Sequence, residues 1–165
     1  MDQDVIKYKN SVYIKTQRLR LEVKIDTQSV QIYDSTGLIK IGSIVSHIYR
    51  NNTIDFILST RGNQGRGYMM EAFDVTLNFL FRLKPDMIVK NIVLSHNIVS
   101  QKFHRSFGFT ELDDGDIFEY TMDAERFKAT QEKRSKRINN YIDAENNSCM
   151  ELVRFDYFKS SGLSR

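Results

Sequence analysis

The sequence has a single cysteine, Cys149, a single proline, Pro85, and no tryptophan. One cysteine cannot form an internal disulfide, and cysteine ligands cannot build a zinc site. No segment approaches the ~20 consecutive apolar residues of a membrane-spanning helix, and residues 1–7 lack the apolar core of a secretion signal. We therefore expect a cytoplasmic protein with no membrane partner and no bound metal.

Neither sign of charge dominates the chain. Lys and Arg number 24 against 21 Asp and Glu, so the net charge is only +3. Such a small excess does not indicate a dedicated nucleic-acid-binding protein. The length of 165 residues suits one domain, and 41% apolar with 27% charged residues is typical of a globular protein with a real core.

Alternating apolar residues predict strands in the first third of the chain. Leu19, Leu21 and Val23 alternate with polar residues, which is the period of a strand with one buried face. Turn-forming residues separate three further strands, so this part predicts an antiparallel meander. The predicted strands are 18–25, 29–33, 38–48 with a kink near Gly42, and 54–59.

The spacing of apolar residues changes to that of a helix in the middle of the chain. Residues from Met69 to Leu83 predict a helix over 68–84, which Pro85 ends. Residues 87–94 are continuous enough in Ile and Val to predict a central strand buried on both faces. The remaining predicted elements are a short helix over 100–107 closed by Gly108, and a hairpin of strands 109–112 and 117–122.

The segment 124–165 differs in composition from the rest. Residues 124–141 are charged and predict a helix, and residues 146–148 predict a break. Six large apolar residues among the ten in 149–158 predict a last strand, since they are costly to leave in water. That strand either extends the sheet or pairs with a second copy of the chain in a homodimer.

Charges of opposite sign are separated near the end of the chain. Six acidic residues and no basic ones lie between residues 111 and 123, and six basic and two acidic residues lie between 125 and 137. We interpret these segments as two solvated faces that partly pair. The alternative is a basic helix face for RNA or an acidic partner. Its residues would be Arg126, Lys128, Lys133, Arg134, Lys136 and Arg137.

A glycine-rich turn, residues 62–69, lies between the fourth predicted strand and the long helix. A helix N-terminus presents unpaired N–H groups and a partial positive charge, and glycines let that backbone close on a phosphate. Arg66 adds a full positive charge. The turn therefore predicts a pyrophosphate site, and the alternative is an ordinary strand-to-helix connection.

Three short segments carry a family resemblance. The turn reads Gln64-x-x-Gly67-x-Met69 and continues into Glu71-Ala72; Asn97 and Ser100 are followed by Gly108-Phe109; and residues 16–21 read Thr-Gln-Arg-Leu-Arg-Leu. In this order and on these predicted elements, they resemble the GCN5-related N-acetyltransferase (GNAT) superfamily. The similarity is strongest to its branch of ribosomal-protein N-terminal acetyltransferases, and it covers roughly residues 14–123.

The resemblance implies an α/β fold, the GNAT acyl-CoA N-acyltransferase fold. Its sheet is mixed and mostly antiparallel, with splayed fourth and fifth strands and helices on both faces. A single acetyltransferase domain would occupy 1–123, with its core in 14–123. Residues 124–165 would form a helix-plus-strand extension, packed on this domain or swapped from it.

The chain departs from the family in two places. Met69 stands where the family has glycine or alanine, and residues 26–28 leave no room for the two helices that usually cover the acceptor. An acceptor side left open in this way favours a macromolecule over a small buried amine.

The resemblance implies transfer of an acetyl group from acetyl-CoA to a primary amine, first of all at a protein N-terminus or a lysine. Alternative acceptors are an aminoacyl-tRNA or a small amine, and an alternative function is a non-catalytic CoA-binding module. The pantetheine arm would lie between the splayed strands and bind the side-chain amide of Asn97. The implied cofactor-binding residues are Leu58, Ser59, Thr60, Gln64, Gly65, Arg66, Gly67, Tyr68, Met69, Asn97 and Ser100.

Three residues are candidates for proton transfer. The family often has a tyrosine as general acid four residues before the Gly-Phe pair, and His104 occupies that position. A histidine donates a proton near neutral pH because its unperturbed pKa is about 6.5. His96 is a second candidate, and Asp55 would relay the proton of the amine through water. In the alternative, water itself protonates the leaving thiolate.

Overall fold

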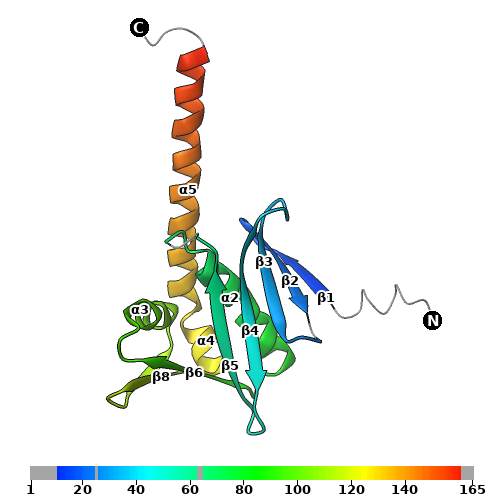
Figure 1. Cartoon of the computed structure of the whole chain (residues 1–165), viewed down its shortest axis with the longest axis vertical. Coiled ribbons are helices and arrows are strands. Elements are labelled where there is room, and N and C mark those ends of the chain that lie inside the picture. Colours follow the sequence, from blue (N-terminus) through cyan, green and yellow to red (C-terminus); the bar gives the residue numbers. More distant parts are fainter. Residues whose placement is uncertain (1–10, 25, 63–64, 161–165) are drawn as a thin grey trace, which may run out of the picture.

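The computed structural model describes residues 11–24, 26–62 and 65–160, with side chains described as far as residue 146. One eight-stranded sheet runs through them in the order β1-β2-β3-β4-β5-β6-β8-β7 (Figure 1). Its strands are β1 (Ser11–Lys15), β2 (Leu19–Lys24), β3 (Ser29–Asp34), β4 (Lys40–Ile48), β5 (Thr53–Thr60), β6 (Ile88–Leu94), β7 (Thr110–Asp113) and β8 (Ile117–Met122). Only β5 and β6 are parallel neighbours. The predicted mixed, mostly antiparallel sheet is confirmed.

The predicted meander corresponds to β2 to β5, and β1 is an additional strand that the sequence analysis did not predict. It pairs with β2 from Ser11 opposite Lys24 to Lys15 opposite Arg20. The predicted kink is present as a register shift, because Gly42 lies opposite Ile32 whereas Lys40 lies opposite Tyr33. Glycine is required at this point, since a Cβ on residue 42 would lie 2.2 Å from the carbonyl oxygen of Ser59.

Four helices pack against one face of the sheet: α2 (Tyr68–Leu83), α3 (Ile98–Phe107), α4 (Ala124–Ala129) and α5 (Gln131–Ser160). A cluster of rings joins α2, α3 and α4 to β5. Phe73 of α2 contacts Phe56, with 5.2 Å between ring centroids, and Phe107 of α3, at 4.9 Å. Phe127 of α4 contacts Phe81 at 5.4 Å. The resemblance implied helices on both faces, but the described helices cover one, because residues 26–28 form only a turn between β2 and β3.

The strand β6 corrects a further expectation. Val89, Asn91 and Val93 are buried, but Ile92 is 61% exposed and Leu94 is 53% exposed. The strand is therefore buried on one face rather than on both. A run of Ile and Val predicts burial on both faces only when both faces are covered, and here no described helix lies over the second face.

The C-terminal segment also differs from its prediction. Residues 149–158 belong to the single helix α5, which continues through 146–148 and extends beyond the rest of the molecule (Figure 1). The predicted break and last strand are therefore wrong, and a homodimer remains a prediction without that strand. A short apolar run has no unique period, so the helix already established at Gln131 decides its conformation. Within the described part of the chain, no helix has the length and apolar character to cross a membrane.

The first half of α5 belongs to the core. Phe127 of α4 and Ile138 and Ile142 of α5 are buried in the same cluster as the sheet residues. The predicted helix over 124–141 is thus present, but it is divided at Thr130 into α4 and α5.

Arg134 is the most completely buried cation of the described residues, with 0% exposure. Its Nε donates to Asp74 Oδ1 at 2.8 Å, and its Nη2 donates to the carbonyl oxygen of Phe127 at 2.7 Å. Its guanidinium carbon also lies 4.1 Å from the ring centroid of Phe127 and 4.9 Å from that of Phe107. One side chain therefore joins α2, α3, α4 and α5, and Arg134 is not part of an exposed basic face.

We expect Arg134→Ala to lower the free energy of unfolding by about 3–5 kcal/mol, because it leaves Asp74 and the backbone carbonyls of Phe107 and Phe127 without their buried partner. Arg137→Ala is the control, since Arg137 lies one turn further along α5 and is exposed; it should change stability by less than about 0.5 kcal/mol. Urea unfolding followed by circular dichroism measures both. Equal stability of the two variants would show that the Arg134 contacts contribute nothing net.

Candidate functional site

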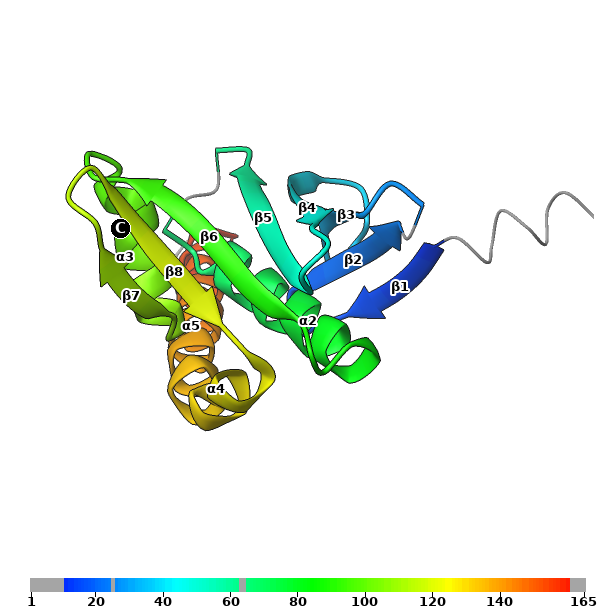
Figure 2. The ribbon, with the colours of Figure 1, turned by 90° about the horizontal axis from the view of Figure 1, so that it is seen from below.

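The strands β5 and β6 separate soon after they begin. They pair only at Thr53 opposite Ile88 and at Ile54 opposite Val89. Beyond these pairs they diverge, as Figure 2 shows. The separation leaves part of the facing strand edges without the partner that a continuous ladder would supply. The splayed pair that the resemblance implied is therefore present.

Two helix N-termini lie at the open end of the split. The chain leaves the end of β5 through the glycine-rich turn and enters α2, and it leaves the end of β6 through Asn97 and enters α3. Ligands of α/β sheets bind outside the carboxyl ends of diverging parallel strands, and helix N-termini attract anions. Most of the predicted cofactor-binding residues are thus gathered at one place.

The backbone of β5 faces the split at alternate residues. The N–H of Phe56 points towards β6, because it donates to the side chain of Asn91 at 3.0 Å. Polar backbone groups alternate in direction along a strand, so those of Leu58 and Thr60 point the same way. The backbone groups of Ser59 point the other way, towards β4, where Ser59 lies opposite Ser43. The predicted segment 58–60 therefore presents two residues, not three, to a ligand in the split.

The turn before α2 has the backbone of a phosphate site. Gly65 and Gly67 have φ of +87° and +72°, and a Cβ on Gly65 would meet no atom within 4 Å. No described side chain caps the first turn of α2, and Arg66 is exposed beside it. Met69 is partly buried and packs against the core. Gln64 lies outside the described residues.

The helix α5 supports this turn from behind. The ring of Tyr141 lies so close to Gly67 that a Cβ there would be 2.3 Å from the ring. Arg18 Nη1 donates to the carbonyl oxygen of Arg66 at 2.8 Å and to Glu145 Oε2 at 3.0 Å. Tyr68, the first residue of α2, donates its hydroxyl to the other oxygen of Glu145 at 3.1 Å. The turn is therefore held by Arg18, which immediately precedes β2, and by residues of the C-terminal helix.

Asn97 and Ser100 begin α3. Asn97 Oδ1 accepts a hydrogen bond from the backbone N–H of Ser100 at 3.2 Å, which makes Asn97 the N-cap of the helix. Among the described residues its amide nitrogen has no hydrogen-bond partner, and Asn97 is exposed where the chain leaves β6. The side chain of Asn97 thus combines a structural bond with a donor for a ligand carbonyl.

His104, the first candidate for the general acid, is buried and only 4% exposed. Its Nε2 lies 3.0 Å from Asn91 Nδ2, and its Nδ1 lies 2.7 Å from the carbonyl oxygen of Ser100. Since the amide nitrogen donates and the carbonyl accepts, the ring carries its proton on Nδ1 and a lone pair on Nε2. Neither nitrogen is left for a substrate.

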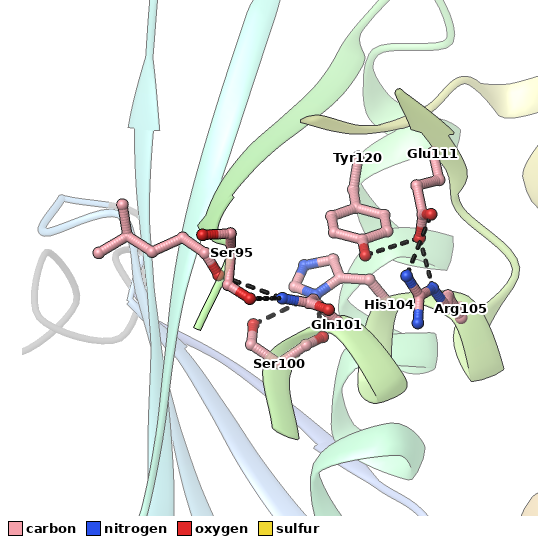
Figure 3. Close-up of polar contacts among 8 residues, drawn as sticks. Ser95, Ser100, Gln101, His104, Arg105, Glu111 and Tyr120 are labelled. Atoms are coloured by element: carbon pink, nitrogen blue, oxygen red, sulfur yellow. Dashed lines mark hydrogen bonds and ion pairs between the residues drawn. The ribbon is translucent and has the colours of Figure 1, made fainter. Parts of the chain in front are cut away.

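The surroundings of His104 favour the neutral ring. Burial lowers its pKa, and the bond to Ser100 opposes this shift. The ring stacks on Tyr120 with 4.7 Å between centroids, and the Tyr120 hydroxyl donates to Glu111 (Figure 3). Burial and this carboxylate raise the pKa of Tyr120 to about 12. These surroundings favour a structural role for His104, in holding neighbouring groups in place, over a role as proton donor.

The other two candidates lie elsewhere. His96 is exposed between β6 and α3. Asp55 lies near the closed end of the split, on the face without helices, where His47 Nδ1 is 3.1 Å from one carboxylate oxygen and Tyr49 donates to the other at 2.8 Å. The hydrogen bond and negative charge of Asp55 raise the pKa of Tyr49. The described residues hold no group of three or more His, Cys, Asp or Glu suited to a metal ion.

The sequence patterns did not point to several residues of the site, among them Asn91, Gln101 and Glu145. Asn91 could have been found, because it is a polar residue in the buried phase of an alternating strand. Gln101 is 3% exposed and donates to the carbonyl oxygens of Leu94 and Ser95 at 3.2 and 2.9 Å (Figure 3). Glu145 carries no signal in the sequence, since its partners are distant along the chain.

The neutral state of His104 predicts a pH dependence of stability. The pKa in the folded protein lies below that of the unfolded chain, so unfolding takes up a proton at pH values between the two. The contribution of neutral His104 to the free energy of unfolding is fully present above about pH 6.5, the pKa of the unfolded chain. It is lost as the pH falls towards the pKa of His104 in the folded protein, by at most about 1.4 kcal/mol per pH unit.

We expect His104→Gln to lose less stability than wild type as the pH is lowered, because the glutamine does not titrate. His96→Gln, a change at an exposed histidine, should keep the pH dependence of wild type. The free energies of unfolding are compared between about pH 8 and pH 5.5. Parallel pH profiles for wild type and His104→Gln would show that His104 titrates alike in both states.

Comparisons with known proteins give matches among solved structures alone. No family model matches this chain, and no curated protein matches it. A GNAT-family acetyltransferase from Bacillus anthracis aligns with 69% of this chain and 99% of its own, at 16% identity and a TM-score of 0.57. The N-terminal domain of the ribosomal-protein-alanine acetyltransferase from Clostridium acetobutylicum aligns with 71% and 99%, at 22% identity and a TM-score of 0.51.

A GCN5-related N-acetyltransferase from Brucella melitensis aligns with 76% of this chain and 84% of its own, at 11% identity and a TM-score of 0.63. At such identities these structures show the fold alone. This structure has three features at the positions that the sequence motifs predicted: the split between β5 and β6, the glycine turn and the N-cap of α3. The chain therefore has the fold of the GCN5-related N-acetyltransferase superfamily, as its motifs predicted.

Proposed function

We propose that this protein is an N-acetyltransferase that transfers an acetyl group from acetyl-CoA to a primary amine. The observation that carries the proposal is the split between β5 and β6, with the uncapped N-terminus of α2 and the N-terminus of α3 at its open end. A long, thin ligand with an anionic centre fits this arrangement. The pantetheine arm supplies the length, and the pyrophosphate supplies the charge.

The residues present fit this ligand. The backbone N–H groups at Gly65 to Met69 and the Arg66 guanidinium would hold the pyrophosphate. The backbone groups of Leu58 and Thr60 would pair with the amides of the arm as a neighbouring strand does. Asn97 Nδ2 would donate to one of its carbonyls. Ser100 would act through its backbone, which orders the side chain of Asn97.

The acceptor amine would approach from the face without helices. Ile57, Ile92 and Leu94 are exposed there, and Asp55 lies on the same face of β5. Asp55, with His47 beside it, would accept the proton of the amine through water. The amine would then attack the thioester carbonyl, and the leaving thiolate would take its proton from water, because His104 has no free N–H.

A protein N-terminus is the acceptor that we favour. One structural neighbour is named a ribosomal-protein-alanine acetyltransferase and another a putative ribosomal-protein-serine acetyltransferase. The uncovered face also gives a polypeptide room that a lid of helices would take away. A lysine side chain is the second choice by the same reasoning.

We expect the protein to release free thiol from acetyl-CoA when peptides with different N-terminal residues are added, and mass spectrometry should place one acetyl group on the peptide amine.

Arg66→Glu should raise KM for acetyl-CoA about tenfold or more, since it puts a negative charge beside the pyrophosphate; tenfold corresponds to about 1.4 kcal/mol. Arg50→Glu, the same change in the exposed β4–β5 turn, is the control. If CoA raises the melting temperature but no acceptor is acetylated, the protein is a CoA-binding module and not an enzyme.

Two substitutions separate the two roles of Asn97. Asn97→Ala should lower stability by about 1 kcal/mol through the lost cap and weaken CoA binding about five- to tenfold. Asn97→Asp keeps a good capping oxygen but loses the amide donor, so it should weaken CoA binding while stability is retained. Calorimetry and urea unfolding measure the two effects. Normal CoA affinity in Asn97→Asp would show that Asn97 only caps α3.

A further inference from the structure

We propose that Asn91 and His104 form a polar spacer that sets the width of the split between β5 and β6, and thereby position the pantetheine arm. This inference rests on the proposed function, since it assigns that arm to the split. It gives His104 the task of a positioning residue in place of a general acid. The two residues come from different elements, β6 and α3, and meet in the interior.

Asn91 takes the place of a backbone partner for β5. The last backbone pair between the strands is Ile54 with Val89, and the next inward N–H of β5 is that of Phe56. In a continuous parallel ladder a carbonyl of β6 would accept this N–H. Here Asn91 Oδ1 accepts it at 3.0 Å, so a side chain stands between the two backbones. The strands are therefore held apart by about the reach of an asparagine.

His104 holds Asn91 in the orientation that this task needs. Because the Phe56 N–H must donate, the amide oxygen of Asn91 faces β5 and its nitrogen faces His104. That nitrogen needs an acceptor, so His104 Nε2 must keep its lone pair. The proton then sits on Nδ1, where the carbonyl oxygen of Ser100 accepts it at 2.7 Å. Each bond in this series determines the direction of the next.

The helix α3 supports the spacer at a second point. Gln101, three residues before His104, donates to the carbonyl oxygens of Leu94 and Ser95 at the end of β6. The ring of His104 also packs between Tyr120 and Phe109, with centroid distances of 4.7 and 4.9 Å. Figure 3 shows Gln101, His104 and Tyr120 in this arrangement. The β6 wall of the split is thus fixed before any ligand arrives, which lowers the entropy cost of binding.

A purely structural explanation accounts less well for these residues. Asn91 is 5% exposed and His104 is 4% exposed, and burying polar groups costs free energy even when they are bonded. A continued ladder would satisfy Phe56 with backbone alone and leave both positions free for apolar residues. A requirement that β5 and β6 stay apart explains why polar residues occupy both positions.

The test compares two ligands. CoA spans both the split and the glycine turn, whereas adenosine 3′,5′-bisphosphate lacks the pantetheine arm and cannot enter the split. The variants are Asn91→Leu, which keeps the size but no hydrogen bond, and His104→Phe, which keeps the ring but not the lone pair. Asn78→Leu, the same change at an exposed position of α2, is the control.

We expect both spacer variants to bind CoA about tenfold or more weakly than wild type, with their affinity for adenosine 3′,5′-bisphosphate changed by less than about twofold. His104→Gln should restore part of the CoA affinity, because its amide oxygen can accept from Asn91. Unchanged CoA affinity in both variants, or an equal loss for both ligands, would overturn the proposal.

A measurement without ligand separates this proposal from the proposed function. Hydrogen exchange at the Phe56 amide should be slow in wild type and Asn78→Leu and at least about tenfold faster in Asn91→Leu, in proteins whose other sheet amides keep their protection. Unchanged exchange would overturn the spacer. Slow wild-type exchange together with no CoA binding to any variant would overturn the assignment of the arm to the split and the proposed function, while the spacer bond itself would stand.

Discussion

The separation of β5 and β6 leaves backbone groups of both strands without their usual partners, and several other parts of the structure supply these hydrogen bonds. After Ile54 and Val89 the two strands no longer pair, yet their backbone groups still require partners. Nearest the closed end, Asn91 supplies one to Phe56, and His104 keeps that asparagine in place. At the far end of β6, Gln101 binds two carbonyls. Between them, the inward groups of β5 face the space in which we place the pantetheine arm, so the protein completes part of the ladder and the ligand completes the rest.

The two faces of the sheet differ in what covers them. The face covered by α2 to α5 contains the aromatic core around Phe73 and provides the rigid support for both helix N-termini. The opposite face keeps Ile57, Ile92 and Leu94 exposed and holds the hydrogen-bonded Asp55 and His47. Acetyl transfer needs a donor held firmly and an acceptor that can enter and leave. A sheet with one packed face and one open face meets both needs, and the short turn at 26–28 is what leaves the second face open.

The first half of the C-terminal helix supports the part of the site that we propose binds the acetyl donor. Arg134 ties α5 to α2, α3 and α4 in the interior, where burial lowers its pKa and Asp74 opposes the shift. About two turns later Tyr141 lies against Gly67, and about one turn beyond it Glu145 receives hydrogen bonds from Arg18 and Tyr68. The same helix thus stabilises the core and supports the glycine turn. Loss of its docking would reach the proposed pyrophosphate site through these contacts.

Local patterns by themselves determined most of the strands, the helix that Pro85 follows, the Gly108 C-cap and the glycine turn, because spacing and turn chemistry act over a few residues. Tertiary structure decided the rest. Ile92 is exposed because no helix covers its face, and 149–158 is helical because α5 begins at a docked first turn. Arg134 is buried because Asp74, sixty residues earlier, meets it. His104 sits where the sequence motif predicted a proton donor, but its protonation is set by Asn91 and by burial, which are properties of the packed interior and not of the residue type.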